Sequence, residues 1–225
     1  MNNEALDSDS VIVEKNGSHF LLISFGGVKK GYGMPIFEFK RTLESIPCDK
    51  IFVRDHHQCW YQKGSDEQIN SREKLLRRLN QLIKEGDYKR IVFLGNSMGG
   101  YAAIYFGVLL KVDRILAFSP QTFIDSFRRL RYRDRRWQKQ LSAVSRWNPF
   151  SAALNLTSHL KKHNEFSGRV NIFFGASDKL DTLHAERLNR FSNVKLIPVE
   201  DQDHSVVRYL RDNGDLKKYL EEGFE

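Results

Sequence analysis

The sequence predicts an α/β protein, a mostly parallel, twisted β-sheet with helices on both faces, formed by residues 1–225 as a single domain. Short apolar runs typical of buried strands alternate with longer segments of helical periodicity. Alternation of this kind implies parallel pairing through right-handed crossovers. No internal repeat or low-complexity linker divides the chain. A chain of 225 residues is long enough to form one hydrophobic core without disulfide bonds or structural metal ions.

The first expected elements are two strands, at residues 11–15 and 20–24. They flank Asn16-Gly17, a dipeptide typical of a type I′ turn, so we expect them to form a hairpin. The second run is more apolar, which places it inside the sheet and the first nearer the edge. A helix is expected from Pro35 to about residue 46, where apolar residues recur at helical spacing.

Further along the chain the same alternation continues. We expect strands at residues 51–53, 91–94, 114–118, 170–175 and 194–199. Helices are expected over 66–85, from the elbow described below to about Lys111, over 182–191 and from 206 onward. Gly86 is a stop signal for the helix before it.

A helical insertion, residues 121–166, interrupts this pattern after the strand that ends near Phe118. Five apolar residues fall on one helical stripe, which predicts an amphipathic helix. They are Phe127, Leu130, Trp137, Leu141 and Val144. A second helix is expected from about 151 to 162, with His159 and His163 on a solvated face.

Composition and cysteine usage indicate a globular intracellular protein. Apolar residues make up 40% and charged residues 28% of the chain, and no apolar run reaches the length of a membrane span. The first ten residues are polar and acidic, unlike a signal peptide. Cys48 and Cys59 flank a predicted strand whose length keeps them too far apart for a disulfide, so we expect free thiols and a cytoplasmic location.

The most informative stretch is Gly95-Asn96-Ser97-Met98-Gly99, a G-x-S-x-G motif. It follows a buried strand and precedes a helix, which is the context of a nucleophile elbow. There a serine sits on a sharp turn, and flanking glycines let strand and helix approach closely. The alternative is a glycine-rich turn with Ser97 as an ordinary helix cap. Motif and flanks together resemble the α/β-hydrolase superfamily.

This resemblance implies a Ser-His-Asp triad in the order Ser97, Asp178, His204. The superfamily places its histidine after the final strand, which selects His204 among the seven histidines. Asp178 directly follows a buried strand, where the superfamily usually keeps its acid. Asp178 is also suited to cap the next helix, and Asp181 is the second candidate.

The resemblance also implies an oxyanion hole, with Met98 supplying one backbone amide. The other is expected from Phe25-Gly26-Gly27, which replaces the superfamily's usual His-Gly; we choose Gly26, with Phe25 and Gly27 as alternatives. Candidate substrate-binding residues near the strand ends are Phe25, Gly27, His57, Trp60 and Phe123, although aromatic residues more often fill a core. No metal is expected, because His56 and His57 are adjacent and not one helical turn apart.

The net charge of +8 is concentrated in the insertion. Between Arg128 and Arg146 seven arginines and one lysine face the single acid Asp134. One interpretation is a solvated helix face at the position where many relatives carry a lid. The other is a landing surface for an acidic partner: an acyl carrier protein, a phosphate-bearing thioester or an anionic lipid surface. A nucleic acid is a less favoured partner, because no recognised binding motif accompanies these arginines.

The sequence thus predicts a serine hydrolase, without cofactor, that cleaves a carboxylic ester or thioester through an acyl-enzyme. The acyl substrate is a small molecule or carrier-bound. An acyltransferase with the same triad is one alternative. A non-catalytic protein whose basic surface binds an acidic partner is the other, since a fold alone never establishes function.

Overall fold

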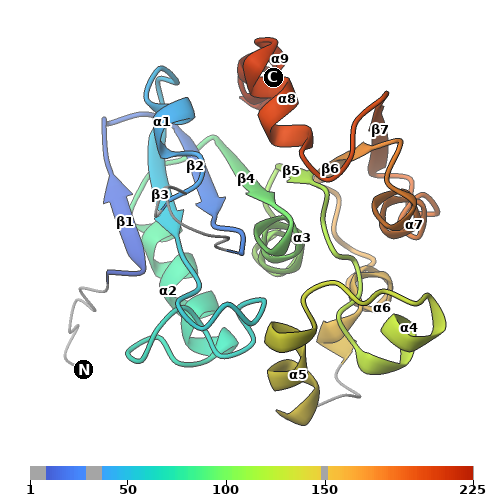
Figure 1. Cartoon of the computed structure of the whole chain (residues 1–225). Helices are drawn as coiled ribbons and strands as arrows, with labels where there is room; N and C mark the ends of the chain where they lie inside the picture. The colour runs from blue at the N-terminus through green and yellow to red at the C-terminus, as the bar shows by residue number, and fades with distance from the viewer. Residues whose placement is uncertain (1–8, 29–36, 148–151, 225) are drawn as a thin grey trace.

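A seven-stranded sheet forms the centre of the protein in the computed structural model, which describes residues 9–28, 37–147 and 152–224 (Figure 1). The strand order is β1-β3-β2-β4-β5-β6-β7, and only β1 is antiparallel to its neighbour. The predicted α/β architecture is therefore confirmed. The strands are β1 (Val11–Glu14), β2 (Phe20–Phe25), β3 (Asp49–Val53), β4 (Arg90–Asn96), β5 (Arg114–Phe118), β6 (Arg169–Gly175) and β7 (Val194–Val199).

Helices cover both faces of this sheet. One face carries α2 (Arg72–Lys84), α3 (Met98–Leu110), α6 (Leu156–Lys162) and α7 (Lys179–Glu186), and the other carries α1 (Lys40–Leu43), α8 (Val206–Asp212) and α9 (Asp215–Glu221). Alternation along each strand supplies both cores: in β2, Leu21 and Ile23 join the first cluster and Leu22 joins the second. Among the described residues, no helix has the length and apolarity that a membrane span needs.

The predicted hairpin is wrong, because β1 pairs with β3 and not with β2. The backbone amides of Asn16 and Ser18 both donate to Oδ1 of Asp49, and the Asn16 side chain donates to the Cys48 carbonyl. These bonds hold the turn against the start of β3, so β1 lies beyond β3. The expected position of β1 nearer the edge is confirmed.

Two helices in the first half are shorter than predicted. The helix expected from Pro35 is a single turn, α1, and Pro35 itself lies outside the described residues. The helix predicted from residue 66 begins at Arg72, because Ser71 caps it by accepting a hydrogen bond from the Lys74 amide. Asp66 Oδ1 instead accepts hydrogen bonds from the amides of Gln68 and Ile69, which form a local turn.

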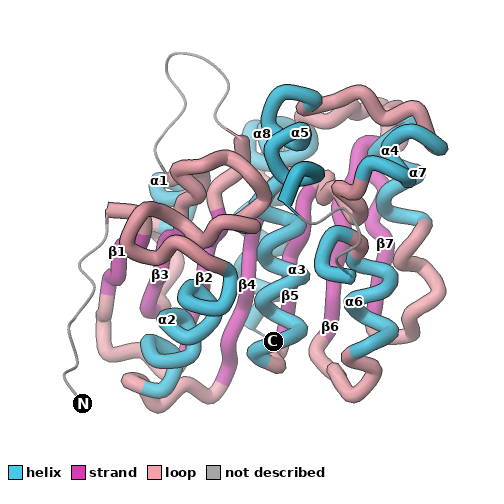
Figure 2. Tube along the Cα trace, turned by 90° about the horizontal axis from the view of Figure 1, so that it is seen from below, coloured by secondary structure: helices cyan, strands magenta, loops and turns pink. Residues whose placement is uncertain are grey.

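The insertion is not one amphipathic helix. It contains α4 (Ser126–Arg131) and α5 (Gln138–Trp147), then a 3₁₀ turn at Ala152–Leu154 and α6. The stripe breaks between them, where Arg133 and Trp137 have positive φ values of 54° and 55°. Leu141 is buried, whereas Phe127 and Leu130 are 71% and 81% exposed. Figure 2 shows α4 and α5 beyond one end of the strands.

His159 is also buried, contrary to the prediction of a solvated position. It is 4% exposed, its Nε2 lies 3.0 Å from the Tyr105 carbonyl oxygen, and its ring stacks on Tyr105 at 4.5 Å. His163 is half-buried beside it. Burial lowers the pKa of His159 to about 4. Cys48 and Cys59 are free, buried thiols.

Candidate active site

The turn between β4 and α3 holds Ser97 in a strained conformation, with φ 54° and ψ −115°. A Cβ atom on Gly95 would lie 2.2 Å from the Gly99 backbone, and one on Gly99 would lie 2.1 Å from the Phe25 carbonyl oxygen. Glycine is therefore required at both positions. The turn leaves Ser97 at the carboxyl end of a central strand, where α/β sheets form their sites.

His204 lies between β7 and α8, and its ring joins Ser97 to a carboxylate. Its Nε2 is 3.2 Å from the Ser97 Oγ, and its Nδ1 is 2.8 Å from Oδ2 and 3.0 Å from Oδ1 of Asp181. A carboxylate at Nδ1 fixes the ring proton there, which leaves Nε2 as an acceptor. The arrangement lets the ring take a proton from the serine hydroxyl.

Asp178, the acid predicted first, does not contact His204 in the described structure. Its Oδ1 accepts hydrogen bonds from the amides of Leu180 and Asp181 at 2.8 and 3.0 Å, so it caps α7. A residue in this position turns its carboxylate back toward the helix. Asp181, the second candidate, is the carboxylate beside His204, and the first choice is corrected.

Arg136 of the insertion contacts the same carboxylate. Its Nη1 donates to Oδ1 of Asp181 at 2.7 Å, and its Nε donates to Oδ1 of Asp134 at 3.2 Å. Burial alone would raise the pKa of Asp181, but bonds and charges from His204 and Arg136 hold that pKa below its usual range. Both carboxylates are almost fully buried, so the arginine compensates their charges.

A second Asp–His pair lies beyond Arg136. Oδ2 of Asp134 is 3.0 Å from Nε2 of the fully buried His184, whose Nδ1 accepts from the Thr122 amide at 2.9 Å. This acceptor role puts the ring proton on Nε2, facing Asp134. Burial holds the pKa of His184 below its usual value. Sequence reasoning missed both Arg136 and this pair, since nothing in the pattern of arginines distinguishes one that points inward.

The predicted oxyanion donor Gly26 is contradicted by its own hydrogen bond. Its amide donates to the Val53 carbonyl at 2.8 Å, as part of the contact between β2 and β3. The neighbouring Gly27 amide points instead to Oε2 of Glu38 at 3.2 Å. Met98 is the first residue of α3, so its amide has no acceptor within the helix. Among the predicted donors, Met98 and Gly27 therefore remain the candidates for an oxyanion hole.

The Glu38 side chain bonds to both the Gly27 amide and Asn96. Its Oε1 accepts from the Asn96 side chain at 2.7 Å, and burial raises the pKa of its carboxyl group. A Cβ atom at Gly27 would lie 2.9 Å from Glu38 Oε2. An acyl oxygen that bonds to the Gly27 amide must therefore replace the Glu38 carboxyl as its acceptor.

Gln121, which was not predicted, contacts the serine directly. Its Nε2 donates to Ser97 Oγ at 3.0 Å, and its Oε1 accepts from the indole of Trp60 at 3.3 Å. Trp60 therefore reaches the site through Gln121, although its own ring is fully buried. The only sequence signal for Gln121 is its position just after β5.

The remaining predicted pocket residues form no hydrogen bond to the serine hydroxyl among the described contacts, and their own contacts are with other groups. Phe25 is fully buried and packs on Tyr61 and Phe106, which makes it a core residue. Phe123 stacks on His184 at 4.1 Å. The His57 amide donates to the Asp55 carboxylate, which also binds two further amides of the loop that carries Trp60.

Solved structures are similar to this chain over nearly its whole length. The capsule O-acetyltransferase of Neisseria meningitidis serogroup A matches with a TM-score of 0.66 at 14% identity, over 94% of this chain and 92% of that chain. The fluorophosphonate-binding serine hydrolase FphF of Staphylococcus aureus matches with 0.66 at 14%, over 100% and 89%. An S-formylglutathione hydrolase from Agrobacterium tumefaciens matches with 0.62 at 15%, over 91% and 84%. No family model matches the sequence, nor does any curated protein.

The chain therefore has the α/β-hydrolase fold, as its elbow motif predicts.

Proposed function

We propose that this protein is a serine hydrolase that cleaves a carboxylic ester or thioester through an acyl-enzyme. The observation that carries the proposal is the continuous chain of contacts from Ser97 Oγ to His204 at 3.2 Å and on to Asp181 at 2.8 Å. Ser97 lies on a strained turn at the carboxyl end of β4. A base within hydrogen-bond reach and an acid that orients this base are what a serine hydroxyl needs to become a nucleophile.

In the proposed reaction Ser97 Oγ attacks the acyl carbon while His204 Nε2 takes the hydroxyl proton. The Asp181 carboxylate stabilises the imidazolium, and the amides of Met98 and Gly27 bind the oxyanion. His204 then returns the proton to the departing alcohol or thiolate. Water, activated by the same ring, releases the acid. All these groups belong to the chain itself, so the reaction needs no cofactor.

A fluorophosphonate probe tests this directly, because it phosphonylates only an activated serine. We expect stoichiometric labelling of folded protein, with Ser97 as the modified residue in a peptide map. The Ser97→Ala variant and urea-unfolded protein are the controls and should remain unlabelled. Folded protein that leaves Ser97 unmodified would favour the alternative of a non-catalytic binding protein.

Acyl transfer to an alcohol or sugar is the second candidate, since it uses the same acyl-enzyme. The likeness to a capsule O-acetyltransferase over 94% of this chain supports it, as does the 5% exposure of Ser97, which limits contact with bulk water. Acyl release measured with and without glycerol or a monosaccharide separates the two. Transfer predicts an acylated acceptor and faster turnover; hydrolysis predicts a rate that the acceptor does not change.

A further inference from the structure

The insertion contains a basic cavity that the proposed reaction does not use. It has a volume of about 220 Å³ and lies between α4 and the start of α5. Its lining includes Arg129, Leu130, Arg133, Asp134, Arg135 and Gln138. Three arginines around a space of this size form a site for a compact anion.

The positive charge of this cavity is not balanced from within. Asp134 is its only acidic lining residue, and both of its oxygens are already bonded to Arg136 and His184. No ion pair to Arg129, Arg133 or Arg135 occurs among the described residues. Three arginines therefore face one carboxylate that is already shared, and a bound anion would supply the missing negative charge.

Arg129 is the innermost of the three cations. Its Nη2 donates to the Arg136 carbonyl, but its Nε is buried and has no partner in the described part of the chain. Burial, and to a lesser degree the positive charge of Arg136, lower the pKa of this guanidinium, although the Asp134 carboxylate acts in the opposite direction. A phosphate oxygen would satisfy the orphaned N–H, whose burial without a partner is unfavourable.

Contacts connect the cavity to the candidate triad. Asp134 forms part of its wall, Arg136 bridges Asp134 to Asp181, and Asp181 holds His204. An anion in the cavity is thus separated from the serine by several side chains. A ligand that occupies both must carry its anionic group on a long arm, away from the acyl carbon.

Two exposed apolar side chains lie on α4, the helix beside the cavity. Phe127 and Leu130 are one turn apart on α4, 71% and 81% exposed, and Leu130 also lines the cavity. An exposed aromatic ring on the helix that supplies Arg129 to the cavity suits a planar base attached to a phosphate.

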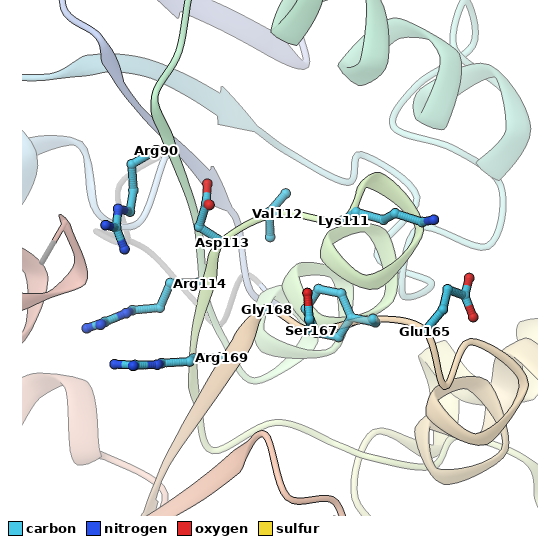
Figure 3. Close-up of a pocket in the computed structure, with 10 residues that line it drawn as sticks. Arg90, Lys111, Val112, Asp113, Arg114, Glu165, Ser167, Gly168 and Arg169 are labelled. Atoms are coloured by element: carbon cyan, nitrogen blue, oxygen red, sulfur yellow. The ribbon is translucent and has the colours of Figure 1, made fainter.

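A second arginine cluster lies at the other end of the sheet. Arg90, Arg114 and Arg169 begin β4, β5 and β6, and their side chains lie next to one another along a hollow of about 350 Å³ (Figure 3). Two carboxylates, Asp113 and Glu165, share its lining. Its position at the amino ends of the strands, opposite Ser97, makes this cluster a matched control.

We propose that the cavity of the insertion binds a phosphate group of the acyl donor, which would be an acyl thioester of the coenzyme A type. This inference rests on the proposed function and adds a donor class to it. In such a donor a pantetheine arm separates the phosphates from the thioester. Ser97 Oγ adds to the acyl carbon, the carbon–sulfur bond of the resulting oxyanion then breaks, and the thiolate takes the proton from His204.

The first test compares two donors that differ only beyond the pantetheine arm. We measure kcat/KM for acetyl-CoA and for S-acetyl-pantetheine in wild type, in Arg133→Gln/Arg135→Gln and in the control Arg90→Gln/Arg169→Gln. Both variants lose two positive charges. The ratio of the two kcat/KM values should fall at least tenfold in the first variant and stay within twofold in the control. An unchanged ratio, or an equal fall in both variants, overturns the proposal.

The second test does not need turnover. Calorimetry of the Ser97→Ala protein with free coenzyme A should give a Kd that rises at least tenfold when Arg133 and Arg135 are replaced, and not when the control arginines are. Inorganic phosphate should compete. Coenzyme A binding without any ester turnover would refute the proposed function and keep the cavity assignment. Absent binding, or insertion-dependent binding to phosphatidylserine vesicles in its place, refutes the cavity assignment alone.

Discussion

Replacing Asp181 by asparagine should remove most turnover while leaving the fold intact. The structure fixes how the new side chain would lie. Arg136 donates to Oδ1 at 2.7 Å, so the amide oxygen takes that position and the NH₂ group takes the place of Oδ2, 2.8 Å from His204 Nδ1. The amide then donates to Nδ1, and the ring proton moves to Nε2. A ring protonated there cannot accept the proton of Ser97.

The size of the effect follows from this tautomer change. The same substitution in a Ser-His-Asp protease triad lowers kcat about 10⁴-fold, equivalent to about 5.5 kcal/mol of activation free energy. We expect a kcat loss of about 10³- to 10⁴-fold here, with p-nitrophenyl acetate as substrate. Fluorophosphonate labelling of Ser97 should slow in parallel.

Asp178→Asn is the matched control, since it makes the same chemical change three residues earlier. Asparagine caps helices about as well as aspartate, so this variant should keep its kcat within about threefold and its stability within a few tenths of a kcal/mol. Circular dichroism melts check both folds. The reasoning is refuted if Asp181→Asn retains more than a tenth of the wild-type kcat, or if Asp178→Asn loses as much.

Three further predictions concern stability, and urea unfolding measures each of them. Arg136→Met leaves two buried carboxylates without their shared cation and should lower the free energy of unfolding by about 3–5 kcal/mol. Arg133 is exposed, so Arg133→Met should change this free energy by less than about 0.5 kcal/mol. Equal effects of the two substitutions would contradict the bridging role of Arg136. Burial lowers the pKa of His159 from 6.5 to about 4 in the folded state, so its neutral ring contributes fully to the free energy of unfolding above pH 6.5. This contribution, up to about 3 kcal/mol, is lost as the pH falls toward 4. A His159→Gln variant should lack this part of the acid sensitivity, and an unchanged dependence of stability on pH would contradict the prediction. Gly99→Ala puts a Cβ atom 2.1 Å from a carbonyl oxygen of β2 and should lower the free energy of unfolding by about 3 kcal/mol or more. In the control Gly223→Ala the new Cβ atom lies 3.4 Å from its nearest neighbour, so this free energy should change by less than about 1 kcal/mol. An equally small effect of Gly99→Ala would mean that the elbow relaxes easily.

The sequence was sufficient for features that depend on local pattern. The G-x-S-x-G motif predicted the β4–α3 elbow, and strand-length apolar runs predicted the strands around it, because burial on both faces leaves a continuous apolar signal. It was insufficient for pairing. Asn16-Gly17 has the composition of a hairpin turn, yet hydrogen bonds to Asp49, more than thirty residues away, determine where that turn lies.

The choice between Asp178 and Asp181 shows the same limit at the site. Both precede or begin one helix, and both follow a buried strand. A cap residue uses its carboxylate on the helix amides, whereas a carboxylate in the first turn projects from the helix and is available to a partner. The spacing D-x-x-D at a helix start therefore favours the second acid as the partner of a distant histidine.

The arginines of the insertion carry the same argument further. By composition they are equivalent, and charge runs of this kind usually cover a solvated face. Arg136 lies between Arg133 and Trp137, both at positive φ, and its side chain bonds to Asp134 and Asp181. One arginine of the segment thus supports the carboxylate behind His204, and Arg129, Arg133 and Arg135 are left around a cavity whose one carboxylate, Asp134, is shared with Arg136 and His184. Substituting these arginines separately distinguishes a structural cation from a ligand-binding one. Arg136→Met should lower the free energy of unfolding whichever substrate the protein acts on. Arg133→Gln/Arg135→Gln should lower kcat/KM only for donors that carry phosphate.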